Sequence, residues 1–126
     1  MNYVYAFEKL QTWKDARVMV KLIYQLTGKL PEYEKYGLAS QMRRAAISVV
    51  SNIAEGSGRP SKKDQAHFYS IAYSSCIELL NQAIISNDLE FITECEIGQM
   101  RNEIEKVTFK INALRKSCLN AVADQG

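Results

Sequence analysis

The stretch Tyr36–Arg59 places residues suited to a helix interface at alternating intervals of four and three. This spacing is typical of a helix face that packs along other helices. The positions on this face are Leu38, Met42, Ala45, Val49, Asn52 and Gly56. The stretch is also rich in alanine and serine, which allow neighbouring helix backbones to approach closely. We therefore predict a long packed helix over Tyr36–Arg59.

The rest of the chain has the same helical periodicity. We predict helices over Thr12–Thr27 and Lys62–Asn87, and a fourth from Thr93 through Ala121 with an unbroken alternation of three and four. No strand-like alternation of useful length is present, and the connections are short. The sequence predicts an all-α protein, an antiparallel up-down-up-down four-helix bundle. It should form one domain over residues 1–126, with an N-terminal arm of residues 1–11.

Three sites carry a Ser or Thr followed three residues later by an acid, which is the pattern of a helix N-terminal capping box. The pairs are Thr12 with Asp15, Ser61 with Asp64, and Thr93 with Glu96. In each pair the hydroxyl is expected to accept a hydrogen bond from the first turn of the helix.

The predicted helix Lys62–Asn87 has apolar residues on more than one face. One track holds Phe68, Ala72, Cys76 and Leu79, and another holds Tyr73, Ile77, Leu80 and Ile84. A single four-helix core does not absorb so wide an apolar surface. We therefore expect this helix to contribute to a contact between subunits of a homo-oligomer.

Composition narrows the functional classes only slightly, because a net charge of +2 favours no partner by itself. The three cysteines (Cys76, Cys95 and Cys118) lack paired spacing, and there is one histidine, His67. We therefore expect no metal site, no disulfide framework and no cofactor. The N-terminus has no signal-peptide pattern and no apolar run is long enough to cross a membrane, so a cytoplasmic location is expected.

A set of cations is the best candidate for a functional site. Its members are Arg43, Arg44, Arg59, Lys62 and Lys63, and Glu55 is the one acid between Lys35 and Lys63. The last three flank a predicted turn, where they are suited to phosphate groups at a basic end of the bundle. The alternative interpretation is a solvated turn, with the helix arginines paired to glutamates.

Three polar residues have structural interpretations. Asn52 and Glu55 lie one turn apart near the predicted interface, where an amide or carboxylate can fix helix register or bind neighbouring backbone. One amide and one carboxylate make a poor metal site. Glu78 is expected to pair with Arg43 or Arg44 across the bundle. His67 lacks an orienting acid and an oxyanion hole, so we predict no catalytic residues.

Several of these residues resemble those of a known family. The similar segments are Trp13-Lys14-x-Ala16, Tyr36-Gly37-Leu38, Ser40–Ala45 and Ser51–Gly56, continued by Ser61–Lys63, Phe68, Glu78-Leu79 and Asp88–Ile92. Together they resemble the four-helix-bundle proteins of 23S rRNA intervening sequences over nearly the whole chain. Val50 departs from the pattern, because the family usually has proline before Ser-Asn; the helix should therefore be straighter here.

The resemblance implies a protein encoded inside an insertion in a ribosomal RNA gene. The chain is also similar to accessory variability proteins of diversity-generating retroelements. Those proteins form five-fold rings whose basic surface engages reverse transcriptase and nucleic acid. The function we expect is a non-enzymatic homopentameric adaptor that binds RNA or DNA. The alternative is a protein-interaction scaffold, for example a partner of a reverse transcriptase, with no nucleic-acid role.

Overall fold

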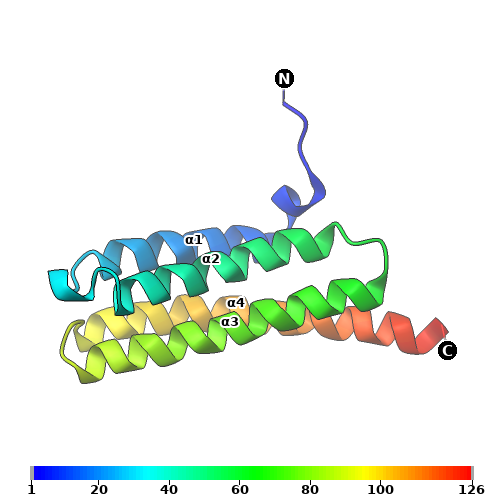
Figure 1. Ribbon diagram of the computed structural model, residues 1–126. Helices are drawn as coiled ribbons and strands as arrows, with labels where there is room; N and C mark the ends of the chain where they lie inside the picture. The colour runs from blue at the N-terminus through cyan, green and yellow to red at the C-terminus, as the bar shows by residue number, and fades with distance from the viewer. Residues whose placement is uncertain (1, 126) are drawn as a thin grey trace.

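The computed structural model describes residues 2–125 and contains four long helices, with no strand in that part of the chain. The helices are α1 (Gln11–Thr27), α2 (Leu38–Ser57), α3 (Lys62–Asp88) and α4 (Glu94–Gln125). Two short 3-10 helices, η1 (Ala6–Lys9) and η2 (Glu32–Glu34), precede α1 and α2. Successive helices run in opposite directions (Figure 1), so the predicted antiparallel four-helix bundle is confirmed.

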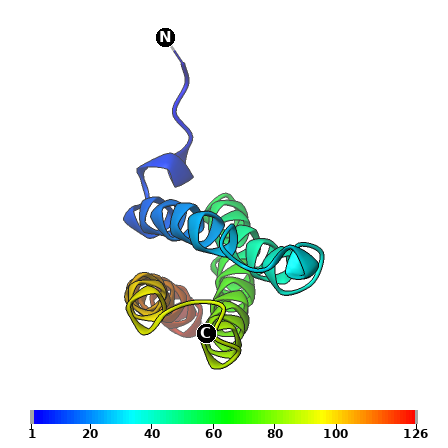
Figure 2. The ribbon, with the colours of Figure 1, turned by 90° about the vertical axis from the view of Figure 1, so that its left-hand side faces the viewer.

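Each long helix packs along two others. Helix α2 lies between α1 and α3, and α4 closes the bundle by contacting both α3 and α1. Figure 2 shows this arrangement end-on. Over its described part, the predicted N-terminal arm is an extended segment followed by η1, and it projects from the side of the bundle (Figure 1). None of the helices in residues 2–125 has the length and apolar character needed to span a membrane.

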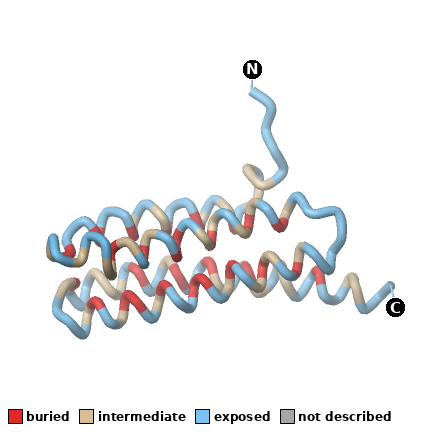
Figure 3. The backbone as a smooth tube through the Cα atoms, viewed as in Figure 1, coloured by how far each residue is buried: buried red, intermediate tan, exposed pale blue. Residues whose placement is uncertain are grey.

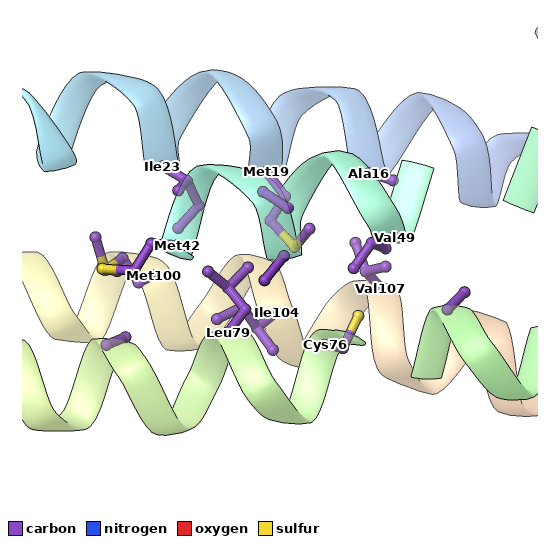
Figure 4. Close-up of a cluster of buried hydrophobic side chains, with 14 of the residues drawn as sticks. Ala16, Met19, Ile23, Met42, Val49, Cys76, Leu79, Met100, Ile104 and Val107 are labelled. Atoms are coloured by element: carbon purple, nitrogen blue, oxygen red, sulfur yellow. The ribbon is translucent and has the colours of Figure 1, made fainter. Parts of the chain in front are cut away.

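The core lies along the axis of the bundle, where buried positions from all four helices meet (Figure 3). Its fully enclosed side chains include Met19, Ile23, Met42, Leu79 and Ile104 (Figure 4). Alanines such as Ala16, Ala46 and Ala72 alternate with these larger residues and are also fully buried. The mixture of large and small residues allows the facing layers to interdigitate.

The interface face of α2 is confirmed at most positions, but not at Asn52. Met42, Ala45, Val49 and Gly56 are buried, whereas Asn52 is only half-buried and Ile53 is fully buried in its place. An α-helix repeats every 3.6 residues, so a strict four-three alternation drifts around it over several turns. Helix α2 is continuous across Val50.

Two of the three predicted capping boxes form helix starts. Ser61 Oγ accepts a 3.0 Å hydrogen bond from Asp64 N at the start of α3. Thr93 Oγ1 accepts from Glu96 N at 3.1 Å, while the Glu96 carboxylate accepts from Thr93 N at 2.9 Å. The prediction at Thr12 is wrong: α1 begins at Gln11, with Leu10 in the cap position, and Thr12 is buried. Packing of the half-buried Leu10 against the core outweighs the local capping pattern.

Candidate nucleic-acid interface

The structure divides the predicted cations between the two ends of α2. Arg43 and Arg44 lie in its first turns beside Lys35, and we call these three residues the corner cluster. Arg59, Lys62 and Lys63 lie at the connection between α2 and α3, and we call them the turn cluster. The two connections are at opposite ends of the bundle (Figure 1). About 20 Å of helix separates Arg44 from Ser57, at 1.5 Å per residue. The five predicted cations therefore do not form one basic end.

The turn cluster is organised around Gln65 and Phe68. The guanidinium of Arg59 lies over the Phe68 ring, 4.5 Å from its centroid. Gln65 Nε2 donates to the Arg59 carbonyl oxygen at 2.7 Å, and Lys62 Nζ donates to Gln65 Oε1 at 3.4 Å. Lys63 is exposed. These contacts hold the backbone of the turn and leave the charged groups accessible to solvent.

Close helix packing places this turn. A Cβ atom added at Gly56 would lie 2.9 Å from Phe68 Cβ and 3.0 Å from Tyr69 Cε1. A glycine at this position therefore lets the end of α2 approach the start of α3, which brings Phe68 within reach of Arg59.

The corner cluster contains one rigid arginine and one solvent-exposed arginine. Arg43 Nε donates to Thr27 Oγ1 at 2.9 Å, and Arg43 Nη2 donates to the Tyr24 carbonyl oxygen at 3.2 Å. The same guanidinium lies over the Tyr24 ring at 4.7 Å from its centroid. Arg44 is exposed, and its side chain forms no hydrogen bond or ion pair within residues 2–125.

The corner cluster borders a hollow of about 600 Å³ on the outer surface of the bundle, which we call the corner groove. Its lining residues are Tyr24, Lys35, Tyr36, Ser40, Arg43, Arg44, Ile47 and Ser48. Three of these residues are cationic, two are aromatic and none is acidic. Lys35 Nζ lies 5.6 Å from the centroid of the Tyr36 ring. A groove with this composition favours an anionic ligand that also has an aromatic part.

Two smaller hollows adjoin Glu78: the first is lined by residues of α2 together with Glu78, and the second by residues of α3 alone. Arg44 and Ser48 line the first as well as the corner groove, and Glu78 lines both of the smaller hollows. The predicted ion pair of Glu78 with Arg43 or Arg44 is absent from residues 2–125. The Arg43 side chain binds Thr27 and Tyr24 of α1 instead. The Glu78 carboxylate instead accepts a 3.2 Å hydrogen bond from Gln82 on its own helix.

Asn52 stabilises the α2–α3 contact indirectly. Its Nδ2 donates to Ser48 O at 2.8 Å and to Ser48 Oγ at 3.2 Å, both on its own helix. Ser48 Oγ in turn shares a 2.7 Å hydrogen bond with Ser75 Oγ of α3. Glu55 is exposed, and its side chain has no hydrogen bond within the described residues, so the predicted structural role of Glu55 is wrong. It points outward because the helix turns it away from the buried Ile53 and Gly56.

Ion pairs in residues 2–125 involve no member of either cationic cluster. They are Lys29 with Glu96 at 2.7 Å, Lys106 with Glu103 at 3.3 Å, and Lys110 with Asp15. Burial alone would raise the pKa of the Asp15 carboxyl. Hydrogen bonds from Lys110 and Gln11, together with the charge of Lys110, outweigh this effect, so the pKa of Asp15 is lowered. Hydrogen bonds from Lys29 and from the Thr93 backbone lower the pKa of Glu96.

The buried thiols offer little chemistry. Burial raises the pKa of Cys76 to about 12, so its reactive thiolate form is scarce near neutral pH. Cys118 is also buried, whereas Cys95 is exposed on α4. No group of three His, Cys, Asp or Glu residues suited to a metal ion occurs in residues 2–125.

The aromatic part of the corner groove was not anticipated from the sequence. Tyr24 lies off the apolar stripe of α1, and Tyr36 belongs to the connection before α2. A signal was nevertheless present, since Tyr36 directly follows Lys35 in the sequence. Only the fold shows that these two rings border the same groove as Arg43 and Arg44.

Comparisons with known proteins agree with this architecture. The sequence model of a family described as 23S rRNA-intervening sequence protein matches residues 8–113. A crystal structure from Bacteroides thetaiotaomicron, described as a protein with unknown function from the S23 ribosomal protein family, superimposes with a TM-score of 0.78. That protein is 19% identical, and the match covers 83% of this chain and 98% of that one. At this identity the likeness shows the fold alone. No curated protein matches the sequence.

Proposed function

The chain belongs to the 23S rRNA-intervening sequence protein family, and from this premise we propose that it is a non-enzymatic adaptor that binds the phosphate backbone of RNA or DNA. The observation that carries the proposal is the pair of cationic clusters on α2 and its connections. None of their six members forms a salt bridge within residues 2–125. Cations without acidic partners are the electrostatic feature that phosphate groups require.

Sequence-independent binding is the mode that these clusters favour. The turn cluster offers flexible lysines and an arginine on an exposed turn, without a helix or ribbon shaped to enter the major groove. Contacts to phosphate groups position a nucleic acid but carry no direct information about its sequence. The affinity should therefore be modest, tolerant of sequence and strongly reduced by salt.

We further propose that the protein acts as a homo-oligomer, and specifically as the pentamer implied by its resemblance to ring-forming accessory proteins. The support from the chain itself is the outer face of α3. Ile71, Ile77 and Ile85 are each between 37% and 46% exposed there, on a helix whose other faces already fill the core. Repeating a weak site around a ring raises avidity without a new contact.

The test compares two triple charge reversals in binding to a structured RNA at low salt, measured by fluorescence anisotropy. Arg59→Glu, Lys62→Glu and Lys63→Glu together should weaken binding strongly, because they reverse one of the two cationic clusters. Glutamates in the first turn of α3 complement the helix dipole, so this variant should keep its helicity. The matched control reverses Lys14, Lys21 and Lys116, which are exposed and lie outside both clusters. The control should lose much less affinity.

The alternative function is a protein-interaction scaffold with no nucleic-acid role. The exposed isoleucines of α3 favour it, because an apolar surface can hold a protein partner as well as another subunit. Failure of the unmodified protein to bind RNA or duplex DNA at low salt, or equal loss in both triple variants, would contradict the proposed function. The scaffold would then be the better account.

A further inference from the structure

The corner groove has features that a purely electrostatic phosphate site does not need. Its lining comes from α1, from the connection that contains Lys35 and Tyr36, and from α2. It therefore brings aromatic rings and cations from three segments to one hollow. Its volume of about 600 Å³ is within the range of pockets that hold small organic groups.

Arg43 is held in place before any ligand arrives. Its Nε and Nη2 atoms are bound to Thr27 Oγ1 and the Tyr24 carbonyl oxygen, and the Tyr24 ring lies beneath its plane. Thr27 Oγ1 is itself fixed by donating to Ile23 O at 2.6 Å. A guanidinium carries five N–H donors, so the remaining donors are available to an anion at little entropic cost.

Tyr36 supplies an aromatic face that the protein does not cover. The residue is 89% exposed, and its ring makes a cation–π contact with Lys35. Bases of single strands stack on such rings, and the stacking tolerates any base because every base has a π-face. In a paired duplex the base faces are covered by their neighbours, so the duplex offers Tyr36 nothing to stack on.

We propose that the corner groove binds one unpaired nucleotide of a single strand, with its base on Tyr36 and its phosphate on Arg43 and Arg44. This inference rests on the proposed function and deepens it: the turn cluster holds phosphates of any nucleic acid, whereas the corner groove selects an unpaired position. The absence of acidic residues from the lining supports an anionic occupant.

The test measures binding of a short single-stranded oligoadenylate and of a fully paired RNA duplex by fluorescence anisotropy. Tyr36→Ala should weaken single-strand binding by roughly five- to a hundredfold and leave duplex binding unchanged. Tyr36→Phe keeps the ring and should retain the wild-type affinity. The matched control is Tyr33→Ala, because Tyr33 is 77% exposed but lies outside the lining and rests edge-on against Phe91.

Three results would overturn the inference. Tyr36→Ala could bind the single strand as tightly as the wild type does, or Tyr33→Ala could lose as much single-strand affinity as Tyr36→Ala. The third result is that adenosine monophosphate alone binds as tightly as the strand. In each case the proposed function stands if the duplex still binds and turn-cluster reversal strongly weakens that binding. If the unmodified protein binds neither the strand nor the duplex at low salt, the inference and the proposed function both fail.

Discussion

Gly56 of α2 faces Phe68 of α3 so closely that a Cβ atom on the glycine would lie 2.9 Å from Phe68 Cβ. Phe68 also supports the guanidinium of Arg59, at 4.5 Å from the ring centroid. The packing of the two helices and the position of Arg59, a member of the proposed phosphate-binding cluster, thus depend on the same small residue.

Gly56→Ala should lower the free energy of unfolding by about 1–2 kcal/mol. Overpacking costs about 1–3 kcal/mol, and the higher helix propensity of alanine returns less than about 1 kcal/mol. Urea denaturation followed by circular dichroism measures the change. The control is Gly98→Ala in α4, where an added Cβ has nothing within 4 Å. That variant should be stabilised by about 0.5–1 kcal/mol. Equal effects at both positions would contradict the close approach.

Mutations on the outer face of α3 should reduce the size of the proposed assembly. We expect Ile77→Glu with Ile85→Glu to dissociate the proposed homo-oligomer, because a charge placed in an apolar contact is desolvated without a partner. Light scattering at micromolar concentration measures the mass. Val18→Glu is the control, since Val18 is an exposed apolar residue on α1. A wild-type mass of 14.3 kDa, that of one chain, would show that no oligomer forms.

Acid should destabilise the protein through Asp15 and Glu96. The pKa of Asp15 lies below its ordinary 3.8, and that of Glu96 lies below its ordinary 4.5. The unfolded chain therefore binds these protons more readily than the folded one. The stability contributed by both groups is present above about pH 4.5 and is lost as the pH falls through the folded pKa values.

Urea midpoints measured from about pH 6 to about pH 3 test this prediction. The variant Lys110→Met removes the partner of Asp15 and should make the fall in stability shallower. Lys116→Met, at an exposed lysine outside the ion pairs of residues 2–125, is the control. A pH dependence that is the same in the wild type and in Lys110→Met would rule out the Asp15 contribution.

The helices could be predicted from the sequence because their signals are local and repeated. In α4, Met100, Ile104, Val107 and Ile111 follow the alternation of four and three, and all of them are buried. Asn52 shows the limit of this reasoning, since a small angular drift decides whether position 52 or 53 enters the core. At Thr12, packing of Leu10 outweighed the capping pattern.

The candidate site could be predicted only in part. The cations were visible in the sequence, but not their division between the two ends of α2. Tyr24 of α1 and Tyr36 line the same corner groove, and this depends on how the connection folds back before α2. The Glu34 carboxylate helps to fix that connection by accepting a 2.8 Å hydrogen bond from Leu38 N. No periodic pattern encodes such a contact.

The central claim is that the two cationic clusters bind phosphate groups, and the salt dependence of the affinity for duplex DNA tests it most directly. Log affinity should fall linearly with log salt concentration, with a slope of about −0.9 for each phosphate neutralised. Reversing Arg59, Lys62 and Lys63 should make that slope shallower by about 2.7 per subunit bound, if each cation neutralises one phosphate. An affinity that does not change with salt, or a slope that is the same in this variant, would contradict the claim.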